Sequence, residues 1–178
     1  MNKERSLNVM FKSDRQDWAT PDNFIEWLND EMCLRFDLDA AASDDNHKAP
    51  SYFTVDDDGL NCDWWGRVWL NPPFGRELPL WLEKCVQEIR REQVESIHVL
   101  IPARTDTKWF HEIVVPNAYA IYLIKGRFNF RFDRAIEGAN APFPSMLVHF
   151  KSDWCGPDGS AALMTLEVPK IARGFDGQ

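Results

Sequence analysis

The sequence predicts an α/β protein with a mostly parallel sheet, helices on both faces of that sheet and an antiparallel hairpin at one edge. Two observations support this fold class. Amphipathic segments with helical spacing alternate with short apolar segments of strand length, which is typical of parallel strands connected by helices. The last two apolar segments are separated by a loop containing Gly and Pro instead of a helix, so we expect that pair to be antiparallel.

Length and composition narrow the class of protein. A chain of 178 residues with 44% hydrophobic and 27% charged residues is typical of one globular domain. No apolar run approaches the roughly 20 residues of a membrane helix, and the N-terminus has no apolar signal core. The four cysteines form no C-x-x-C pair, which argues against structural zinc. We expect a cytoplasmic protein without a metal site, in which residues 17–168 form the domain and residues 1–16 and 169–178 are tails.

The first predicted elements bring an acidic residue to the end of a strand. Thr20 precedes Pro21 and an amphipathic segment, so we expect a helix over residues 21–33 with Thr20 as its N-cap. Residues 34–43 then alternate apolar and acidic side chains, which predicts a short strand with Asp39 at its carboxyl end. In open α/β sheets, ligands bind at that edge.

A long polar segment follows, over residues 43–63. Long segments with little structure of their own are usually functional or disordered in compact domains. Asp56, Asp57 and Asp58 directly precede Gly59, and three adjacent carboxylates in a tight turn repel one another. Two explanations remain open: a bound cation or donor-rich ligand, or a turn in solvent.

The strand predicted over residues 67–71 must end abruptly. Pro72 and Pro73 have no N–H to donate, so the strand cannot continue past Asn71. Asn71 precedes a proline and is therefore biased to an extended conformation. The chain presents an amide, prolyl carbonyls and the ring of Phe74 at a rigid tip, and these groups suit a planar ligand with an NH2 group. A purely structural turn is the alternative.

The remaining segments complete the predicted sheet. The spacing of apolar residues predicts helices over residues 78–92 and 106–115 and strands over residues 96–103, 118–125, 145–150 and 161–168. His98 lies inside an apolar strand. We therefore expect His98 to be a core imidazole whose ring nitrogens are hydrogen-bonded.

The charges are unevenly distributed along the chain. The net charge is −8, which taken alone argues against a nucleic-acid partner. Residues 36–65 contain eight acidic residues and one basic residue, whereas residues 104–134 contain six basic and three acidic residues. One half could hold a cationic small molecule while the other faces phosphates. A solvated charged face is the commoner cause of such a pattern.

The groups at the tip also suggest a reaction. If Asn71 Oδ1 and the Pro72 carbonyl each accept one hydrogen of an exocyclic ring amine, the nitrogen is drawn toward tetrahedral geometry and its lone pair is localised. The amine then becomes a nucleophile, and Phe74 provides a face on which the ring can stack. No general base is needed before transfer, because the product cation loses its proton afterwards.

The chain resembles the phage-type DNA adenine N6-methyltransferases, which belong to the amino-methyltransferase superfamily that uses S-adenosylmethionine. The resemblance covers residues 17–150. Asn71, Pro72, Pro73 and Phe74 match the family's catalytic motif, in which Asn, Asp or Ser is followed by Pro-Pro and then Tyr or Phe. The resemblance implies an abbreviated, Rossmann-like methyltransferase fold, S-adenosylmethionine as cofactor, DNA as partner and the cytoplasm of a bacterial host cell as location.

The resemblance assigns cofactor contacts to three segments: a Thr-Pro element before the first helix, the first strand end with its loop, and an Asp-Gly pair. In this chain these residues are Trp18, Thr20 and Pro21; Asp39, Ala40 and Ala41; and Asp58 and Gly59. The chain departs from the family pattern in the loop, where alanines replace the expected glycines. The segment before Arg67 is also too short for two full βα units.

The basic half supplies the candidate DNA contacts. Five basic residues could hold DNA phosphates, and one of two aromatic residues could pack on an extruded base. The basic candidates are Arg104, Lys108, Arg127, Arg131 and Arg134, and the aromatic candidates are Phe128 and Phe130. A plain edge strand with solvated arginines is the alternative for residues 126–143.

Two further functions remain as alternatives. The tip could hold another nitrogen, such as an amine in RNA or the side-chain amide of a protein glutamine, although such enzymes usually keep the glycine-rich loop. A cofactor-binding but inactive interaction protein is the second alternative, motivated by the net charge of −8.

Overall fold

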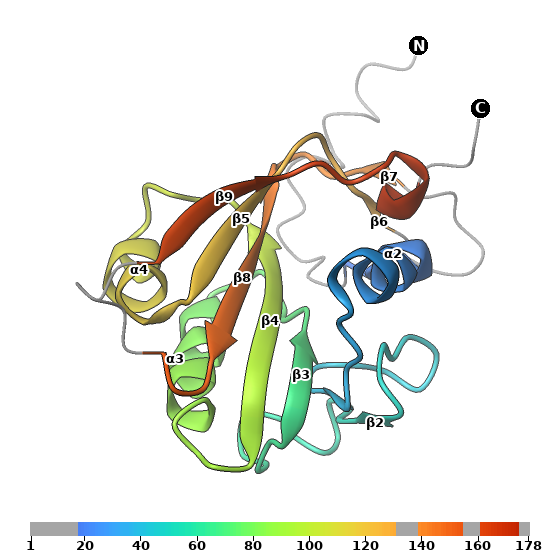
Figure 1. Cartoon of the computed structure of the whole chain (residues 1–178). Helices are drawn as coiled ribbons and strands as arrows, with labels where there is room; N and C mark the ends of the chain where they lie inside the picture. The colour runs from blue at the N-terminus through green and yellow to red at the C-terminus, as the bar shows by residue number, and fades with distance from the viewer. Residues whose placement is uncertain (1–17, 131–138, 155–160, 175–178) are drawn as a thin grey trace.

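The structure, a computed structural model, is organised around a seven-stranded sheet with the order β2-β1-β3-β4-β8-β5-β9 (Figure 1). It describes residues 18–130, 139–154 and 161–174. Four neighbouring pairs are parallel and two are antiparallel. The strands are β1 Leu38–Asp39, β2 Ser51–Tyr52, β3 Gly66–Leu70, β4 Val94–Pro102, β5 Ala120–Ile124, β8 Ser145–Lys151 and β9 Ala162–Leu166. The prediction of a mostly parallel α/β sheet is confirmed.

The antiparallel strand does not lie where the sequence predicted it. β8 is inserted between β4 and β5 and is antiparallel to both, whereas β9 forms the edge and is parallel to β5. The expected antiparallel hairpin at the edge is therefore wrong. β5 therefore lies between β8 and β9 in the sheet, and local turn signals do not distinguish this arrangement from a direct hairpin.

Helices cover both faces, as predicted, and the alternation of side chains along the strands shows the two layers. In β8, Met146, Val148 and Phe150 pack into one apolar cluster, and Leu147 packs into the other. The first cluster contains residues of α3 Leu78–Glu88 and of the π-helical turn η1 Phe110–Val114. The second contains residues of α2 Asp22–Met32.

Several local boundaries differ from the predictions. The N-cap of α2 is Pro21, not Thr20, and it makes no side-chain capping bond. Instead of one regular helix over residues 106–115, the chain forms η1 followed by α4 Val115–Asn117, with a proline in the first turn of α4. A small second sheet pairs β6 Asn129–Phe130 with β7 Ala139–Asn140. The segment after β5 therefore leaves the main sheet instead of extending it.

Residues 169–174, predicted to belong to a tail, pack against the domain. They include the short 3-10 helix η2 Ile171–Arg173. Ala172 is buried in the same apolar cluster as α2, and Asn23 Nδ2 in α2 donates to the carbonyl oxygen of Ile171 at 3.3 Å. The packed part of the domain thus extends past residue 168.

The candidate functional residues lie along the edge of the sheet formed by the carboxyl ends of its parallel strands. β4 and β5 are both antiparallel to β8, so they run in the same direction as each other and as β1 and β3. The carboxyl ends of these four strands therefore lie at one edge, the upper end of the sheet in Figure 1. Asp39 is the last residue of β1 and Asn71 follows β3 there, and Arg104 and Arg127 follow β4 and β5.

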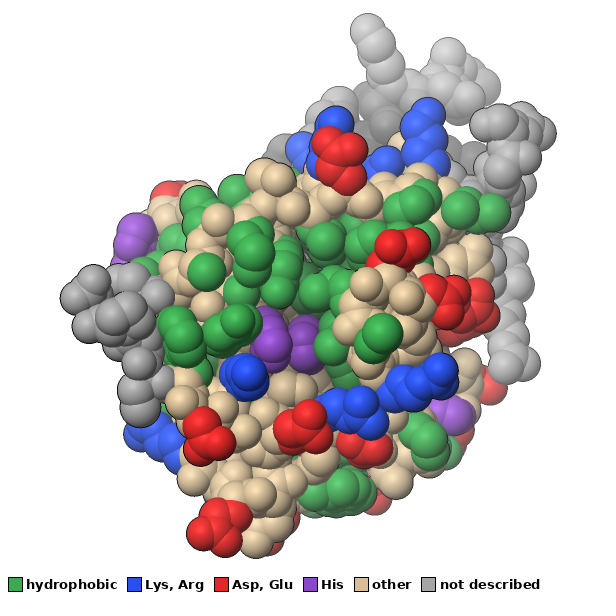
Figure 2. All heavy atoms as spheres, viewed as in Figure 1, with side chains coloured by type: hydrophobic (Ala, Val, Ile, Leu, Met, Phe, Trp, Pro, Cys, Tyr) green, Lys and Arg blue, Asp and Glu red, His purple; other side chains and the backbone are tan. Residues whose placement is uncertain are grey.

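Two histidines face each other on the α2 side of the sheet. His98 in β4 and His149 in β8 are directly opposite, and their rings stack with centroids 4.1 Å apart. Burial lowers the pKa of His98 well below its ordinary value and that of His149 to about 4. Among the described residues, neither nitrogen of His98 has a hydrogen-bond partner, nor does His149 Nε2. His98 is a core residue as expected, but the expected hydrogen bonds are absent. Figure 2 shows a pair of histidine side chains in a hollow on this face.

Candidate active site

The tip after β3 holds an amide in a single orientation. Asn71 Nδ2 donates to the carbonyl oxygen of Trp18, which fixes the side chain. Asn71 Oδ1 is buried and has no hydrogen-bond partner among the described residues. Because an unpaired buried acceptor is costly, it is commonly explained by a missing partner. The tip therefore presents one acceptor that a ligand N–H can satisfy.

Aromatic rings surround the tip. Phe74 is only 8% exposed, and its ring lies edge-on to Phe143 and Phe130, with centroids 5.6 and 6.4 Å away. Trp18 also contacts Phe143 and Phe130 edge-on, at 5.1 and 5.6 Å. Phe74 thus has little free face of the kind the sequence suggested. The half-buried ring of Phe143 also joins the site, at the end of a segment, residues 135–143, that the sequence suggested for DNA readout and not for the tip.

The Thr-Pro element provides a second unpaired group. Thr20 is 3% exposed, and its Oγ1 has no hydrogen-bond partner in the described part of the chain. The bond from Asn71 to the Trp18 carbonyl holds this element against the tip. The structure thus brings together two buried polar atoms without partners, Thr20 Oγ1 and Asn71 Oδ1, on segments that are in direct contact.

Asp39 organises the loop that follows β1. Its side chain accepts from the backbone N–H of Lys48 at 2.9 Å and from that of Ala41 at 3.3 Å. Burial raises the pKa of Asp39 to about 6, and these two backbone bonds oppose the rise. Both carboxylate oxygens are engaged by the chain itself. Asp39 therefore shapes the loop of Ala40 and Ala41 instead of presenting a free carboxylate.

The Asp-Gly pair lies against the same loop. A Cβ added to Gly59 would lie 2.2 Å from the carbonyl oxygen of Ala40, so only glycine permits this approach. Asp58 is exposed, with φ 55°, and its Oδ2 accepts from Asn61 Nδ2 at 2.6 Å. Asp57 accepts from Thr54 instead, which lowers the pKa of Asp57. Local hydrogen bonds thus separate the adjacent carboxylates, and the described residues contain no group of three potential metal ligands.

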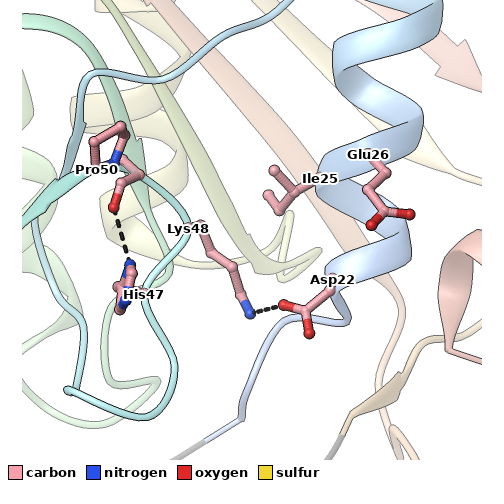
Figure 3. Close-up of a pocket in the computed structure, with 7 residues that line it drawn as sticks. Asp22, Ile25, Glu26, His47, Lys48 and Pro50 are labelled. Atoms are coloured by element: carbon pink, nitrogen blue, oxygen red, sulfur yellow. Dashed lines mark hydrogen bonds and ion pairs between the residues drawn. The ribbon is translucent and has the colours of Figure 1, made fainter.

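A pocket of about 320 Å³ lies beside this loop, between the start of α2 and residues 47–50. Figure 3 shows Lys48 reaching from the loop toward Asp22 at the start of α2, where the two side chains form an ion pair. Asp22, Ile25, Glu26, His47, Lys48, Ala49 and Pro50 line the pocket. Thr20, Asp39 and Asn71 do not line it. Lys48 is the link between the two places, because its backbone N–H is bonded to Asp39.

The basic candidates lie along the carboxyl edge where they are described. Arg104, Lys108 and Arg127 are exposed, and Lys108 forms an ion pair with Glu112 at 3.5 Å. Arg131 and Arg134 lie outside the described residues. Arg76, which the sequence did not single out, is also exposed and follows Phe74 by two positions. Its place next to the proline motif was the signal that could have identified it.

The two candidate base-stacking phenylalanines are core residues. Phe128 and Phe130 are both 0% exposed, and Phe128 packs on Phe24 of α2 with ring centroids 4.8 Å apart. The expectation that Phe128 stacks on an extruded base is therefore wrong for the conformation described. Phe130 instead supports the tip through its contacts with Trp18 and Phe74.

Sequence comparison identifies the family. Residues 8–170 match the family described as DNA N-6-adenine-methyltransferase (Dam). The chain belongs to this family. A relative named DNA N-6-adenine-methyltransferase, from Haemophilus phage HP1 (strain HP1c1), is 30% identical over 142 residues, which are 79% of this chain and 81% of the relative. The resemblance inferred from the proline motif is thus confirmed.

Two further proteins are similar over different lengths. A protein of the same name from Escherichia phage T1 is 35% identical over 100 residues, covering 53% of this chain and 39% of that protein. Among solved structures, the modification subunit of a putative type I restriction enzyme from Vibrio vulnificus YJ016 aligns with a TM-score of 0.50 and 13% identity. That alignment covers 94% of this chain and 51% of the other, so this chain spans about half its length. It supports the predicted α/β fold.

The described residues include no helix that is both long and apolar enough to cross a membrane.

Proposed function

We propose that the protein transfers a methyl group from S-adenosylmethionine to the N6 amine of adenine in DNA, with Asn71 at the catalytic centre. Membership in the Dam family supports the reaction. The observation that carries the catalytic assignment is the buried Oδ1 of Asn71, which has no partner among the described residues, beside an Nδ2 that is already bonded to Trp18. This acceptor can satisfy its hydrogen-bonding capacity on an amine N–H.

The chain activates the amine by accepting its hydrogens. Asn71 Oδ1 takes one N–H, and the carbonyl of Pro72 is the proposed acceptor for the other. Two such bonds localise the nitrogen lone pair and aim it, because the bond to Trp18 fixes Asn71 Oδ1 and the rigid Pro72-Pro73 segment fixes the Pro72 carbonyl. Phe74, buttressed by Phe143, limits how the base can sit against the tip. After transfer the product nitrogen releases its extra proton to water.

The proposed cofactor wall is made from the Thr-Pro element, the loop after β1 and the Asp-Gly pair. When bound there, S-adenosylmethionine supplies the electrophilic methyl group. Thr20 Oγ1 offers a hydroxyl without a partner among the described residues. Ala40, Ala41 and Gly59 offer closely approaching backbone, with the loop held in shape by Asp39. Trp18, Pro21 and Asp58 complete the proposed set.

The proposed DNA contacts lie at the carboxyl edge. Arg104, Lys108 and Arg127 come from the ends of β4 and β5, and Arg76 from the tip after β3. We add Arg76 because its guanidinium is exposed next to the residues that hold the base. Arg131 and Arg134 stay in the proposal from sequence alone. The expected place of action is the cytoplasm of a bacterial host, which is supported by the phage origin of the named relatives.

Transfer of label from S-adenosylmethionine carrying a radioactive methyl group tests the proposal. Unmethylated DNA, RNA and a glutamine-containing peptide are offered separately as acceptors. The proposal predicts label in DNA only. Label in RNA or peptide but not in DNA would identify one of the alternative acceptors, and cofactor binding without transfer to any of them would identify an inactive binding protein. Either outcome would refute the proposal.

A further inference from the structure

Arg173 joins the C-terminal segment to the connection between β5 and β6. Its Nε donates to the carbonyl oxygen of Val168 at 3.1 Å, and its Nη1 donates to the carbonyl oxygen of Arg127 at 2.8 Å. The two accepting residues are far apart in sequence. One guanidinium therefore ties the backbone of a proposed DNA-contact residue to the end of the chain.

The connection between β5 and β6 leaves space for the guanidinium of Arg173. Gly126 has φ 92°, a value that favours glycine. A Cβ at this position would also lie 2.2 Å from Nη1 of Arg173 and 2.7 Å from its Cζ. Gly126 thus provides both the left-handed turn after β5 and the space that Arg173 occupies.

A second contact between the C-terminal segment and the region of β6 lies beside the one that Arg173 makes. Asn129 Nδ2, in β6, donates to the carbonyl oxygen of Gly174 at 3.1 Å. Gly174 has φ 86°, and a Cβ added there would lie 2.6 Å from the carbonyl oxygen of Asn129 and 2.9 Å from Pro21 Cγ. The C-terminal segment is therefore packed between β6 and the Thr-Pro element. Asn23 in α2 holds the same segment through its bond to Ile171.

We propose that Arg173 is a positioning residue for DNA binding, which fixes Arg127 and the start of β6 relative to the cofactor wall. This inference rests on the proposed function. Arg173 acts through Arg127: its bond to the Arg127 carbonyl sets the direction from which the Arg127 side chain reaches a phosphate. A contact residue held in place before binding loses less conformational entropy when DNA arrives.

The shape of the guanidinium matters more than its charge in this role. Arginine offers donors in a planar fork and can reach two carbonyls in different directions, whereas lysine is a single point charge on a flexible stem. Arg173→Lys keeps the charge of the protein and loses the fork. It therefore separates positioning from simple electrostatic attraction.

The test measures binding of a labelled DNA duplex by fluorescence anisotropy and binding of S-adenosylmethionine by calorimetry. The variants are Arg173→Lys, Arg127→Ala, their combination, and Arg91→Lys as the matched control. Arg91 also bridges two partners, Asp63 and Glu88, but it follows α3 at the opposite edge of the sheet. Thermal unfolding of every variant is recorded, and wild-type methylation of DNA is assayed in parallel.

We expect Arg173→Lys to weaken DNA binding by up to about tenfold, because ordering a contact side chain that is no longer held before binding costs about that much. The affinity for S-adenosylmethionine should not change, and Arg91→Lys should behave as wild type. The combined variant should bind DNA no more weakly than Arg127→Ala alone, because Arg173 acts through Arg127.

Three outcomes would overturn the inference: wild-type DNA affinity in Arg173→Lys, equal loss of cofactor and DNA affinity, or additive effects of the two substitutions. If Arg173→Lys does not fold, Asn129→Ala tests the neighbouring bond from Asn129 to the Gly174 carbonyl. This variant should also bind DNA more weakly and keep its affinity for S-adenosylmethionine. A wild-type protein that binds DNA but does not methylate it would refute the proposed function and leave this test of Arg173 intact. A wild-type protein that does not bind DNA would refute both.

Discussion

Replacing Asn71 by Ala should separate catalysis from stability. The substitution removes the bond from Nδ2 to the Trp18 carbonyl, a loss of about 1 kcal/mol of stability. It also removes Oδ1, a buried acceptor without a partner in the described part of the chain, whose burial costs about 1 to 3 kcal/mol. The free energy of unfolding should therefore stay within about 1 kcal/mol of wild type or rise. Turnover should fall on the order of a hundredfold or more, since the acceptor that orients the amine is lost.

Denaturant unfolding, cofactor calorimetry and single-turnover methyl transfer together measure these effects. Asn117→Ala is the matched control, because Asn117 Nδ2 also donates to a backbone carbonyl, that of Ile113 at 2.8 Å, away from the tip. The control should lose about 1 kcal/mol of stability and keep wild-type turnover. If Asn71→Ala instead loses stability and cofactor affinity in proportion to its loss of turnover, Asn71 is a structural residue and the argument from its unpaired oxygen is wrong.

Three other predictions concern the wall of the site, the tip and the histidine pair. Gly59→Ala should weaken cofactor binding about tenfold, because the added Cβ would clash with the Ala40 carbonyl. Calorimetry measures this affinity, and an unchanged value would place the cofactor elsewhere. Arg76→Ala should reduce the slope of log DNA affinity against log salt by about 1. The control Arg90→Ala changes an exposed arginine beyond the far end of α3 and should leave the slope unchanged. Equal slopes for the two variants would exclude Arg76 as a DNA contact. The pKa of His149 is lowered to about 4 in the folded protein. As pH falls, the unfolded chain therefore binds a proton at this position before the folded chain does. The stability that neutral His149 contributes is lost as pH falls from about 6.5 toward 4. The stability of His149→Phe relative to wild type should accordingly rise by about 3 kcal/mol between pH 7 and pH 4 in denaturant unfolding; parallel pH profiles would contradict the buried, neutral state.

The site was predictable from sequence where local covalent chemistry determines the backbone. Pro72 and Pro73 lack N–H groups, so the strand had to end at Asn71 whatever surrounded it. Asp39 was correctly expected at the carboxyl end of its strand. The expected role of its side chain changed, because its hydrogen bonds come from Lys48 and Ala41 within the loop. The backbone of a loop is not specified by the types of its residues.

Features that depend on pairing between distant segments were not predictable. The position of β8 between β4 and β5 depends on pairing with two strands that are distant in sequence, and a position at the edge of the sheet would satisfy the same apolar pattern. His98 lacks its expected hydrogen bonds among the described residues, because the ring of His149 across the strands stacks on its face instead of meeting its nitrogens. Phe128 and Phe130 alternate with polar residues, so they share one face of the strand, but the sequence does not indicate that α2 covers that face. The C-terminal segment packs through Ala172 and through hydrogen bonds to backbone carbonyls, and these carbonyls have no sequence signature.

The central claim is that Asn71 orients the N6 amine of adenine for methyl transfer in DNA. The most direct measurement is mass spectrometry of nucleosides from unmethylated DNA incubated with the protein and S-adenosylmethionine, with Asn71→Ala alongside. The account predicts N6-methyl-2′-deoxyadenosine with wild type and on the order of a hundredfold less with Asn71→Ala. Methylation of cytosine, or equal yields of methyladenine from both proteins, would contradict it.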